Sequence, residues 1–261
     1  MPTCYRHPRR ETGVSCSNCG NPICPDCMTP TPVGMRCPDC ASQRTPVRTM
    51  RSMAVEPIAT YVLIAVNVAI YLGARTSARA YFDLSLTSGG IAQGDWWKLV
   101  TNGFMHDPGN IFHLLLNMYA LFWLGRMIEP ALGHARYLGI YVSALLCGSL
   151  GVLLLEPDAR AVGASGAIFG LFGAALIMAR NRNISLMQTG LLPVLGLNLV
   201  ITFLPGSHIA YGAHLGGLIG GIVAAFAVEQ LAQRRASLVP AIVFCVVLSA
   251  AAVAGSVLTA G

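Results

Sequence analysis

The chain has 261 residues, of which 54% are apolar and 11% are charged, and its net charge is +6. About a quarter of the residues of a soluble domain are charged, so this composition excludes an ordinary soluble protein and indicates a membrane protein. Lys98 is the only lysine, and the arginines flank apolar segments. This placement favours lipid headgroups over nucleic acid as their partner. Arginine together with abundant alanine and glycine is typical of a GC-rich bacterial source.

Seven of the nine cysteines precede residue 41 and belong to pairs separated by two residues. Two such pairs can bind one tetrahedral ion, so we expect two structural Zn²⁺ ions. Disulfides are the alternative, but an odd number of cysteines and a histidine in the pattern argue against them. Which pairs share an ion stays open, although the short gap between the second and third pairs favours alternation. The predicted ligands are Cys4 and His7, Cys16 and Cys19, Cys24 and Cys27, and Cys37 and Cys40.

Residues 1–41 therefore form a module with too small a core to fold without metal. The module resembles treble-clef and B-box-like zinc domains, which implies a role in holding a cytoplasmic protein partner. It has few aromatic residues, so we expect no nucleic-acid binding. Its thiolates need a reducing compartment, which places the N-terminus in the cytoplasm. Residues 42–57 are predicted to be a basic linker at the membrane surface.

The remainder of the chain predicts an all-α, polytopic membrane helix bundle. Several spans are near or below the roughly 17 residues that a crossing needs, which suggests helices that open into a wet cavity. Nine arginines flank the spans on the side of the N-terminus and four basic residues flank them on the other side. The positive-inside rule therefore also predicts a cytoplasmic N-terminus and an extracytoplasmic C-terminus. The seven expected spans are 58–74, 111–125, 137–155, 164–179, 189–204, 209–228 and 238–258.

The connection between the first two spans, residues 75–110, is long and contains Trp96 and Trp97. Such a segment suits the bilayer interface, either as a plain anchor or as a gate for lateral access. His106, in this connection, is interpreted as part of its internal hydrogen bonding. His134 and His208 are interpreted as surface histidines.

Two polar residues in later apolar segments suggest a hydrolase. Ser165 begins an apolar segment, where the free N–H groups of a helix N-terminus stabilise an oxyanion. His214 lies inside another apolar segment, a costly position for an imidazole without a function. Glycines follow each of them at helical spacing, and small residues let membrane helices approach closely. The sequence thus predicts one helix contact that brings Ser165 and His214 together.

His113 and Asn117 lie four residues apart and hence on one helix face. Taken alone, these two residues would be interpreted as forming hydrogen bonds between helices. Beside a serine and a histidine in later spans, donation to an oxyanion becomes the better interpretation.

His113-x-x-x-Asn117, Gly163-Ala164-Ser165-Gly166 and Ala213-His214-Leu215-Gly216-Gly217 occur in this order on the second, fourth and sixth spans. This combination, with the preceding Val100-Thr101-Asn102-Gly103-Phe104-Met105-His106, resembles the rhomboid intramembrane serine proteases. The resemblance implies a six-helix core over residues 58–230 and a seventh transmembrane helix over 236–258. It also implies hydrolysis of peptide bonds in transmembrane protein substrates without a cofactor. Ser165 would be the nucleophile, His214 the general base, and Asn117 and His113 oxyanion donors.

The chain departs from the family at one position. The family often has a tyrosine one turn after the serine, where this chain has Phe169, so we expect stacking on His214 without a hydroxyl. Arg126-x-x-Glu129 resembles a structural polar motif of the loop after the second span. The alternative functions are a catalytically silent relative that binds membrane clients, and a transporter or channel, which the absence of charged residues within the spans argues against. A multi-pass protein of a bacterial plasma membrane is expected.

Overall fold

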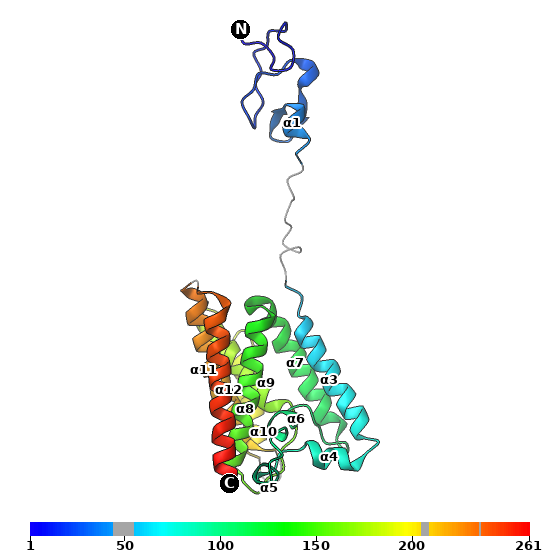
Figure 1. Ribbon diagram of the computed structural model, residues 1–261, viewed down its shortest axis with the longest axis vertical. Coiled ribbons are helices and arrows are strands. Elements are labelled where there is room, and N and C mark those ends of the chain that lie inside the picture. The colour runs from blue at the N-terminus through cyan, green and yellow to red at the C-terminus, as the bar shows by residue number, and fades with distance from the viewer. Residues whose placement is uncertain (44–54, 205–208, 235) are drawn as a thin grey trace. The chain divides into compact units, whose positions relative to one another are not determined.

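A computed structural model describes residues 1–43, 55–204, 209–234 and 236–261 (Figure 1). The chain divides into two compact units, Met1–Ala54 and Val55–Gly261. Most of the predicted basic linker, as well as His208, lies outside the described residues.

The first unit is built from short elements around its cysteines. It contains η1 (Pro25–Cys27), the antiparallel hairpin of β1 (Thr29–Thr31) and β2 (Gly34–Arg36), and α1 (Pro38–Ala41). Its buried cluster consists of Ile23 and six cysteines. A cluster composed almost wholly of cysteines provides little apolar burial, in agreement with a fold that depends on metal.

The second unit is helical, and its long helices run side by side (Figure 1). Helix α11 packs between α8 and α9, α12 covers another side of α8, and α7 joins α9 to α3. Short helices fill the connection between α3 and α7. The elements are α3 (Ile58–Ala74), α4 (Ala78–Leu84), α5 (Ser88–Ala92), α6 (Lys98–Thr101), α7 (Ile111–Leu132), α8 (His134–Leu155), α9 (Ser165–Asn181), α10 (Leu191–Thr202), α11 (Tyr211–Gln233) and α12 (Leu238–Ala260).

Four of the described helices, α7, α8, α11 and α12, are long and apolar enough to cross a membrane. Helices α3, α9 and α10 are apolar but shorter. The distribution of side chains on α12 is that of a helix in lipid. Its small residues Ala241, Cys245 and Ala252 face the bundle, whereas Val239 and Val247 are exposed. The second unit is therefore a multi-pass membrane bundle.

The second predicted span ends too early. Helix α7 continues beyond residue 125 to Leu132, so Arg126 and Glu129 lie within the helix and not in the loop after it. The physical reason is a long-range contact. The Glu129 carboxylate accepts hydrogen bonds from the N–H groups of Ala59 and Thr60, both at 2.8 Å, at the start of α3. This contact satisfies orphan N–H groups of α3 and gives the buried carboxylate its partners.

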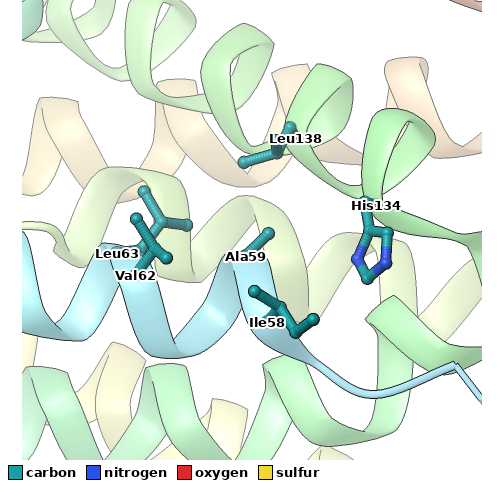
Figure 2. A pocket seen from close by; sticks show the side chains of 6 residues that line it. All are labelled: Ile58, Ala59, Val62, Leu63, His134 and Leu138. Atoms are coloured by element: carbon teal, nitrogen blue, oxygen red, sulfur yellow. The ribbon is translucent and has the colours of Figure 1, made fainter.

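An apolar pocket of about 390 Å³ lies beside this contact (Figure 2). It is lined by Ile58, Ala59, Val62, Leu63, His134 and Leu138. His134 is exposed, as expected of a surface histidine, but it starts α8 and its Nδ1 lies 2.5 Å from Glu129 Oε1. None of the predicted site residues lines the pocket, so we assign it no part in the chemistry.

Candidate functional site

The eight predicted metal ligands form two groups of four. Cys4 and His7 join Cys24 and Cys27, while Cys16 and Cys19 join Cys37 and Cys40. The first pair thus meets the third and the second meets the fourth, which is the alternating arrangement. In each group all ligand atoms lie within 4.8 Å of one another.

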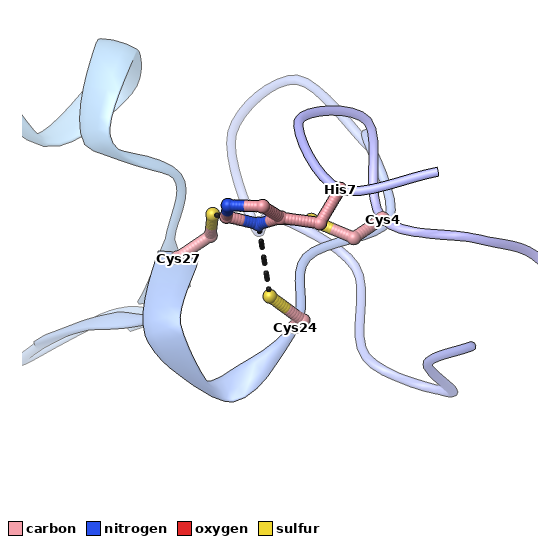
Figure 3. Close-up of side chains that lie close together, drawn as sticks. All are labelled: Cys4, His7, Cys24 and Cys27. Atoms are coloured by element: carbon pink, nitrogen blue, oxygen red, sulfur yellow. Dashed lines mark hydrogen bonds between the residues drawn. The ribbon is translucent and has the colours of Figure 1, made fainter. Parts of the chain in front are cut away.

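The spacing within each group fits a tetrahedral zinc ion. Two sulfurs bound at about 2.3 Å in a tetrahedron are about 3.8 Å apart, and Cys19 Sγ lies 3.8 Å from Cys37 Sγ. In the other group, His7 presents Nδ1 to the sulfurs of Cys4, Cys24 and Cys27 at 3.8, 3.4 and 3.4 Å (Figure 3). His7 Nδ1 is therefore the nitrogen that faces the position of an ion.

Backbone N–H groups support the thiolate form of Cys16 and Cys37. Cys37 N–H donates to Cys16 Sγ at 3.2 Å, and Cys40 N–H donates to Cys37 Sγ at 3.4 Å. Hydrogen bonds from the backbone of Cys19 and Cys37 lower the pKa of Cys16 to about 6. Because the thiolate is the metal ligand, this donor set and its surroundings fit zinc.

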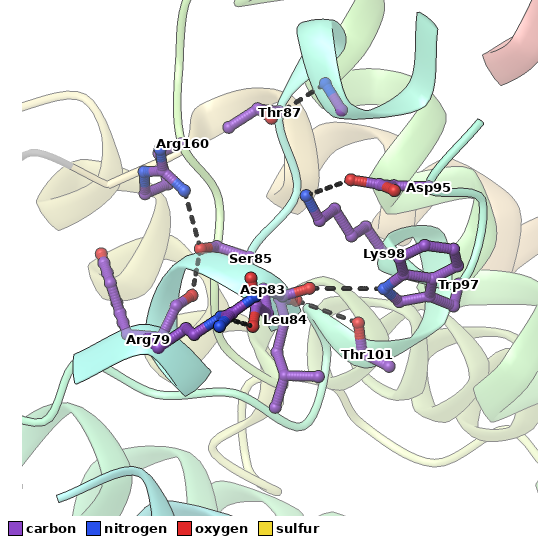
Figure 4. Close-up of polar contacts among 12 residues, drawn as sticks. Arg79, Asp83, Leu84, Ser85, Thr87, Asp95, Trp97, Lys98, Thr101 and Arg160 are labelled. Atoms are coloured by element: carbon purple, nitrogen blue, oxygen red, sulfur yellow. Dashed lines mark hydrogen bonds and ion pairs between the residues drawn. The ribbon is translucent and has the colours of Figure 1, made fainter. Parts of the chain in front are cut away.

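In the second unit, residues 75–110 form a layer of short helices joined by polar contacts (Figure 4). Thr101 donates to the Leu84 carbonyl at 3.0 Å, and Arg160 donates to Ser85 Oγ at 3.0 Å. Trp96 and Trp97 stay 58% and 54% exposed, as an interfacial position requires. This layer also fixes the segment that leads to Ser165.

Two backbone contacts hold that segment. Leu86 and Ala161 form an antiparallel bridge, and Gly163 N–H donates to the Asn102 carbonyl at 2.9 Å. Asn102 is itself fixed, since its Nδ2 donates to the carbonyls of Lys98 and Leu99 at 2.7 and 2.9 Å. Ser165 then opens α9, directly after Ala164 at the N-cap.

His113 lies close to Ser165 across Gly163. Gly163 has φ +121°, and a Cβ built on it would lie 2.8 Å from His113 Nε2 and 3.7 Å from Ser165 Oγ. The two side-chain atoms are thus at most 6.5 Å apart, the sum of these distances. The volume that glycine leaves empty lies between the Ser165 hydroxyl and a ring nitrogen of His113.

Asn117 and His106 complete this side of the site. Asn117 is 7% exposed, and its Nδ2 donates to the His113 carbonyl at 2.8 Å. The interpretation of His106 as a residue of the loop's own hydrogen bonding is wrong. It is fully buried, neither ring nitrogen has a hydrogen-bond partner among the described residues, and its ring lies 5.0 Å from that of His113.

The predicted glycine contact joins α9 to α11. A Cβ on Gly217 would lie 2.0 Å from the Gly166 carbonyl oxygen, and one on Gly221 would lie 2.2 Å from Gly170 Cα. Real Cβ atoms do not approach so closely, so only glycine permits this helix distance. The backbones of the two helices therefore touch directly after Ser165 on α9 and one turn after His214 on α11.

His214 is 6% exposed, and its ring stacks on Phe169 with a centroid distance of 4.0 Å and an interplanar angle of 15°. The expected stacking is thus confirmed. The His214 Nδ1 atom also lies 2.7 Å from Thr202 Oγ1 of α10. We did not predict Thr202, because a threonine in an apolar helix gives no signal of a distant partner. Across the described residues, Ser165 and His214 form no hydrogen bond with each other.

Comparison with known proteins gives a consistent result. The Rhomboid domain family model matches residues 93–231. The chain is 38% identical over 150 residues to YdcA of Bacillus subtilis (strain 168), covering 56% of this chain and 74% of that protein. It is 36% identical over 181 residues to the rhomboid protease GluP of the same organism, covering 66% of this chain and 35% of GluP.

A plant protein, RHOMBOID-like protein 7 of Arabidopsis thaliana, is 31% identical over 182 residues, covering 61% of this chain and 56% of that protein. The matched region of the family model includes α7, α8, α9, α10 and α11 up to residue 231, and hence the glycine contact between α9 and α11. The chain belongs to the rhomboid family.

Proposed function

We propose that this protein is an intramembrane serine protease that hydrolyses peptide bonds in or near transmembrane segments of membrane proteins. The observation that carries the proposal is the stack of His214 on Phe169, one turn after Ser165 on α9. It supports an imidazole held beside the helix that begins with the serine. The family and the protease GluP among its relatives agree with this reaction class.

In the proposed reaction, Ser165 Oγ attacks the carbonyl carbon of the scissile bond while His214 takes the hydroxyl proton. The tetrahedral intermediate collapses when His214 returns that proton to the leaving amine. Water then attacks the acyl-enzyme with His214 again as base, which releases the second product and restores the serine. No cofactor is needed for these steps.

The negative charge of the intermediate would be stabilised by the Ser165 N–H, His113 and Asn117. Ser165 N–H belongs to the first turn of α9, where backbone donors have no partner within the helix. A side-chain amide has two N–H bonds, so Asn117 can keep its contact with the His113 carbonyl and still donate to the oxyanion. The empty volume at Gly163 supports a site for this oxygen.

The test is cleavage of a model transmembrane substrate by the purified protein in detergent or liposomes. Ser165→Ala is expected to abolish cleavage while thermal unfolding stays that of the wild type. Ser256→Ala is the matched control, because Ser256 donates only to the Ala252 carbonyl of its own helix. Retained cleavage in Ser165→Ala would eliminate the proposal and favour a catalytically silent relative that binds membrane clients.

For the first unit we propose two structural zinc ions and the docking of a cytoplasmic protein partner. The ligand distances support the metal, and the basic flanks of the spans support a cytoplasmic N-terminus with an extracytoplasmic C-terminus. A bacterial plasma membrane is the location that we propose. A pulldown with the full chain, with and without chelator, tests docking; equal recovery of partners from the metal-free protein would contradict it.

A further inference from the structure

The environment of His214 Nδ1 suggests how this imidazole keeps its tautomer without a carboxylate. Thr202, which is 3% exposed, ends α10 and places Oγ1 2.7 Å from His214 Nδ1. The same oxygen lies 2.6 Å from the Asn198 carbonyl oxygen, one turn earlier on α10. Thr202 therefore lies between a carbonyl acceptor and the imidazole nitrogen.

The hydrogen-bond inventory of these groups decides the direction of each bond. A carbonyl oxygen can only accept, so the single hydroxyl hydrogen of Thr202 is donated to the Asn198 carbonyl, the usual bond of threonine to the preceding turn of a helix. Toward the imidazole, Thr202 Oγ1 can then act only as an acceptor. The Nδ1 atom must carry a hydrogen, and the lone pair of a neutral imidazole is left on Nε2.

We propose that Thr202 is a positioning residue that holds His214 in the Nδ1–H tautomer, so that Nε2 can take the proton of Ser165. This inference rests on the proposed function and adds a third member to the proposed dyad. The Phe169 stack fixes the plane of the ring, and the Thr202 bond fixes its rotation within that plane. When the ring becomes an imidazolium, Nδ1–H continues to donate to Thr202, so no group has to move.

The role resembles that of the carboxylate in a Ser-His-Asp triad, with one chemical difference. A hydroxyl oxygen is neutral, so it orients the ring but stabilises the imidazolium less than a carboxylate does. General-base catalysis contributes about 10²- to 10⁴-fold to a rate. Removal of the hydroxyl alone should cost a part of this, about 10- to 100-fold in kcat.

The test compares Thr202→Val, which keeps the shape and removes the hydroxyl, with Thr202→Ser, which keeps the hydroxyl. For Thr202→Val we expect a kcat about 10- to 100-fold lower and an unchanged KM, because substrate binding is not altered. Thr202→Ser should restore most of kcat. Thr259→Val is the matched control, since it removes the same type of bond, from Thr259 Oγ1 to the Gly255 carbonyl, on α12.

A second readout requires no turnover. In the full-length protein labelled with ¹⁵N-histidine, and with His214 assigned by loss of its signals in His214→Ala, Nδ1 should show the shift of a protonated nitrogen and Nε2 that of an unprotonated one. An Nε2–H tautomer in the wild type, or wild-type kcat in Thr202→Val, would overturn the inference. Failure of the proposed function is distinct, because it appears as cleavage by Ser165→Ala whatever the tautomer.

Discussion

The contact between α9 and α11 makes a quantitative prediction for Gly217→Ala. A methyl group at this position would lie 2.0 Å from the Gly166 carbonyl oxygen and 2.7 Å from its carbon. Ordinary contact begins at 3.4 Å, so the two helices must separate by about 1.4 Å along the line from the methyl carbon to the Gly166 carbonyl oxygen. Neither obstacle is a flexible side chain, and the strain cannot be relieved by a rotamer change.

Overpacking of this kind costs about 1–3 kcal/mol, and we expect a loss of at least that size in the free energy of unfolding. The effect on catalysis should be larger. Gly217 follows His214 by one turn, and Gly166 is next to Ser165, so the separation acts on the distance between the two reacting groups. A displacement of about 1 Å can lower a rate by about 10²-fold.

The assay combines unfolding in a denaturing detergent mixture with cleavage of the model substrate. Gly73→Ala is the control, because a Cβ on Gly73 meets nothing within 4 Å, and we expect its unfolding free energy to change by less than about 1 kcal/mol. If Gly217→Ala were as stable and as active as Gly73→Ala, the close approach of α9 and α11 would not be what positions His214.

Three further predictions concern other contacts. Cys24→Ser should lower the zinc content, measured by elemental analysis, from two ions to one per chain. Cys245→Ala, which lies outside both ligand groups, should leave the zinc content at two ions. Equal zinc content in the two variants would contradict the first ligand group. Glu129→Gln replaces one carboxylate oxygen by an NH2 group, which then faces the N–H of Ala59 or of Thr60, and should lower the unfolding free energy by about 1–3 kcal/mol. An unchanged unfolding midpoint would refute the role of the carboxylate. Glu156→Ala removes the acceptor of the Gly212 N–H at the start of α11 and should lower the free energy of unfolding by about 1 kcal/mol. Glu156→Gln keeps an oxygen acceptor and should retain most of the wild-type stability. Equal losses of stability in the two variants would show that the hydrogen bond contributes nothing.

The spacing of residues along the chain was sufficient to predict those features that depend on residues close together in the sequence. The two-residue gap between cysteines predicts a zinc knuckle because both side chains must reach one ion, and the structure shows which of these pairs lie together. The first span, 58–74, coincides with α3, since Pro57 and the apolar run define it without help from other helices. The glycines after Ser165 likewise predict a close helix contact.

Features that depend on distant partners were missed. Helix α7 passes residue 125 because Glu129 finds its donors on α3, about 70 residues earlier in the chain. His106 lies against His113 and Thr202 against His214, although nothing adjacent in the sequence marks either contact. Hydrogen bonds between helices depend on how the bundle packs, and helical periodicity alone does not reveal this packing.

The most direct test of the proposed chemistry is covalent labelling of the full-length protein with a serine-directed phosphonate, followed by mass spectrometry of the modified peptide. An activated nucleophile predicts one modified residue, Ser165, and loss of the label in His214→Ala. Label on another serine, no label at all, or equal labelling in His214→Ala would contradict a serine activated by this histidine.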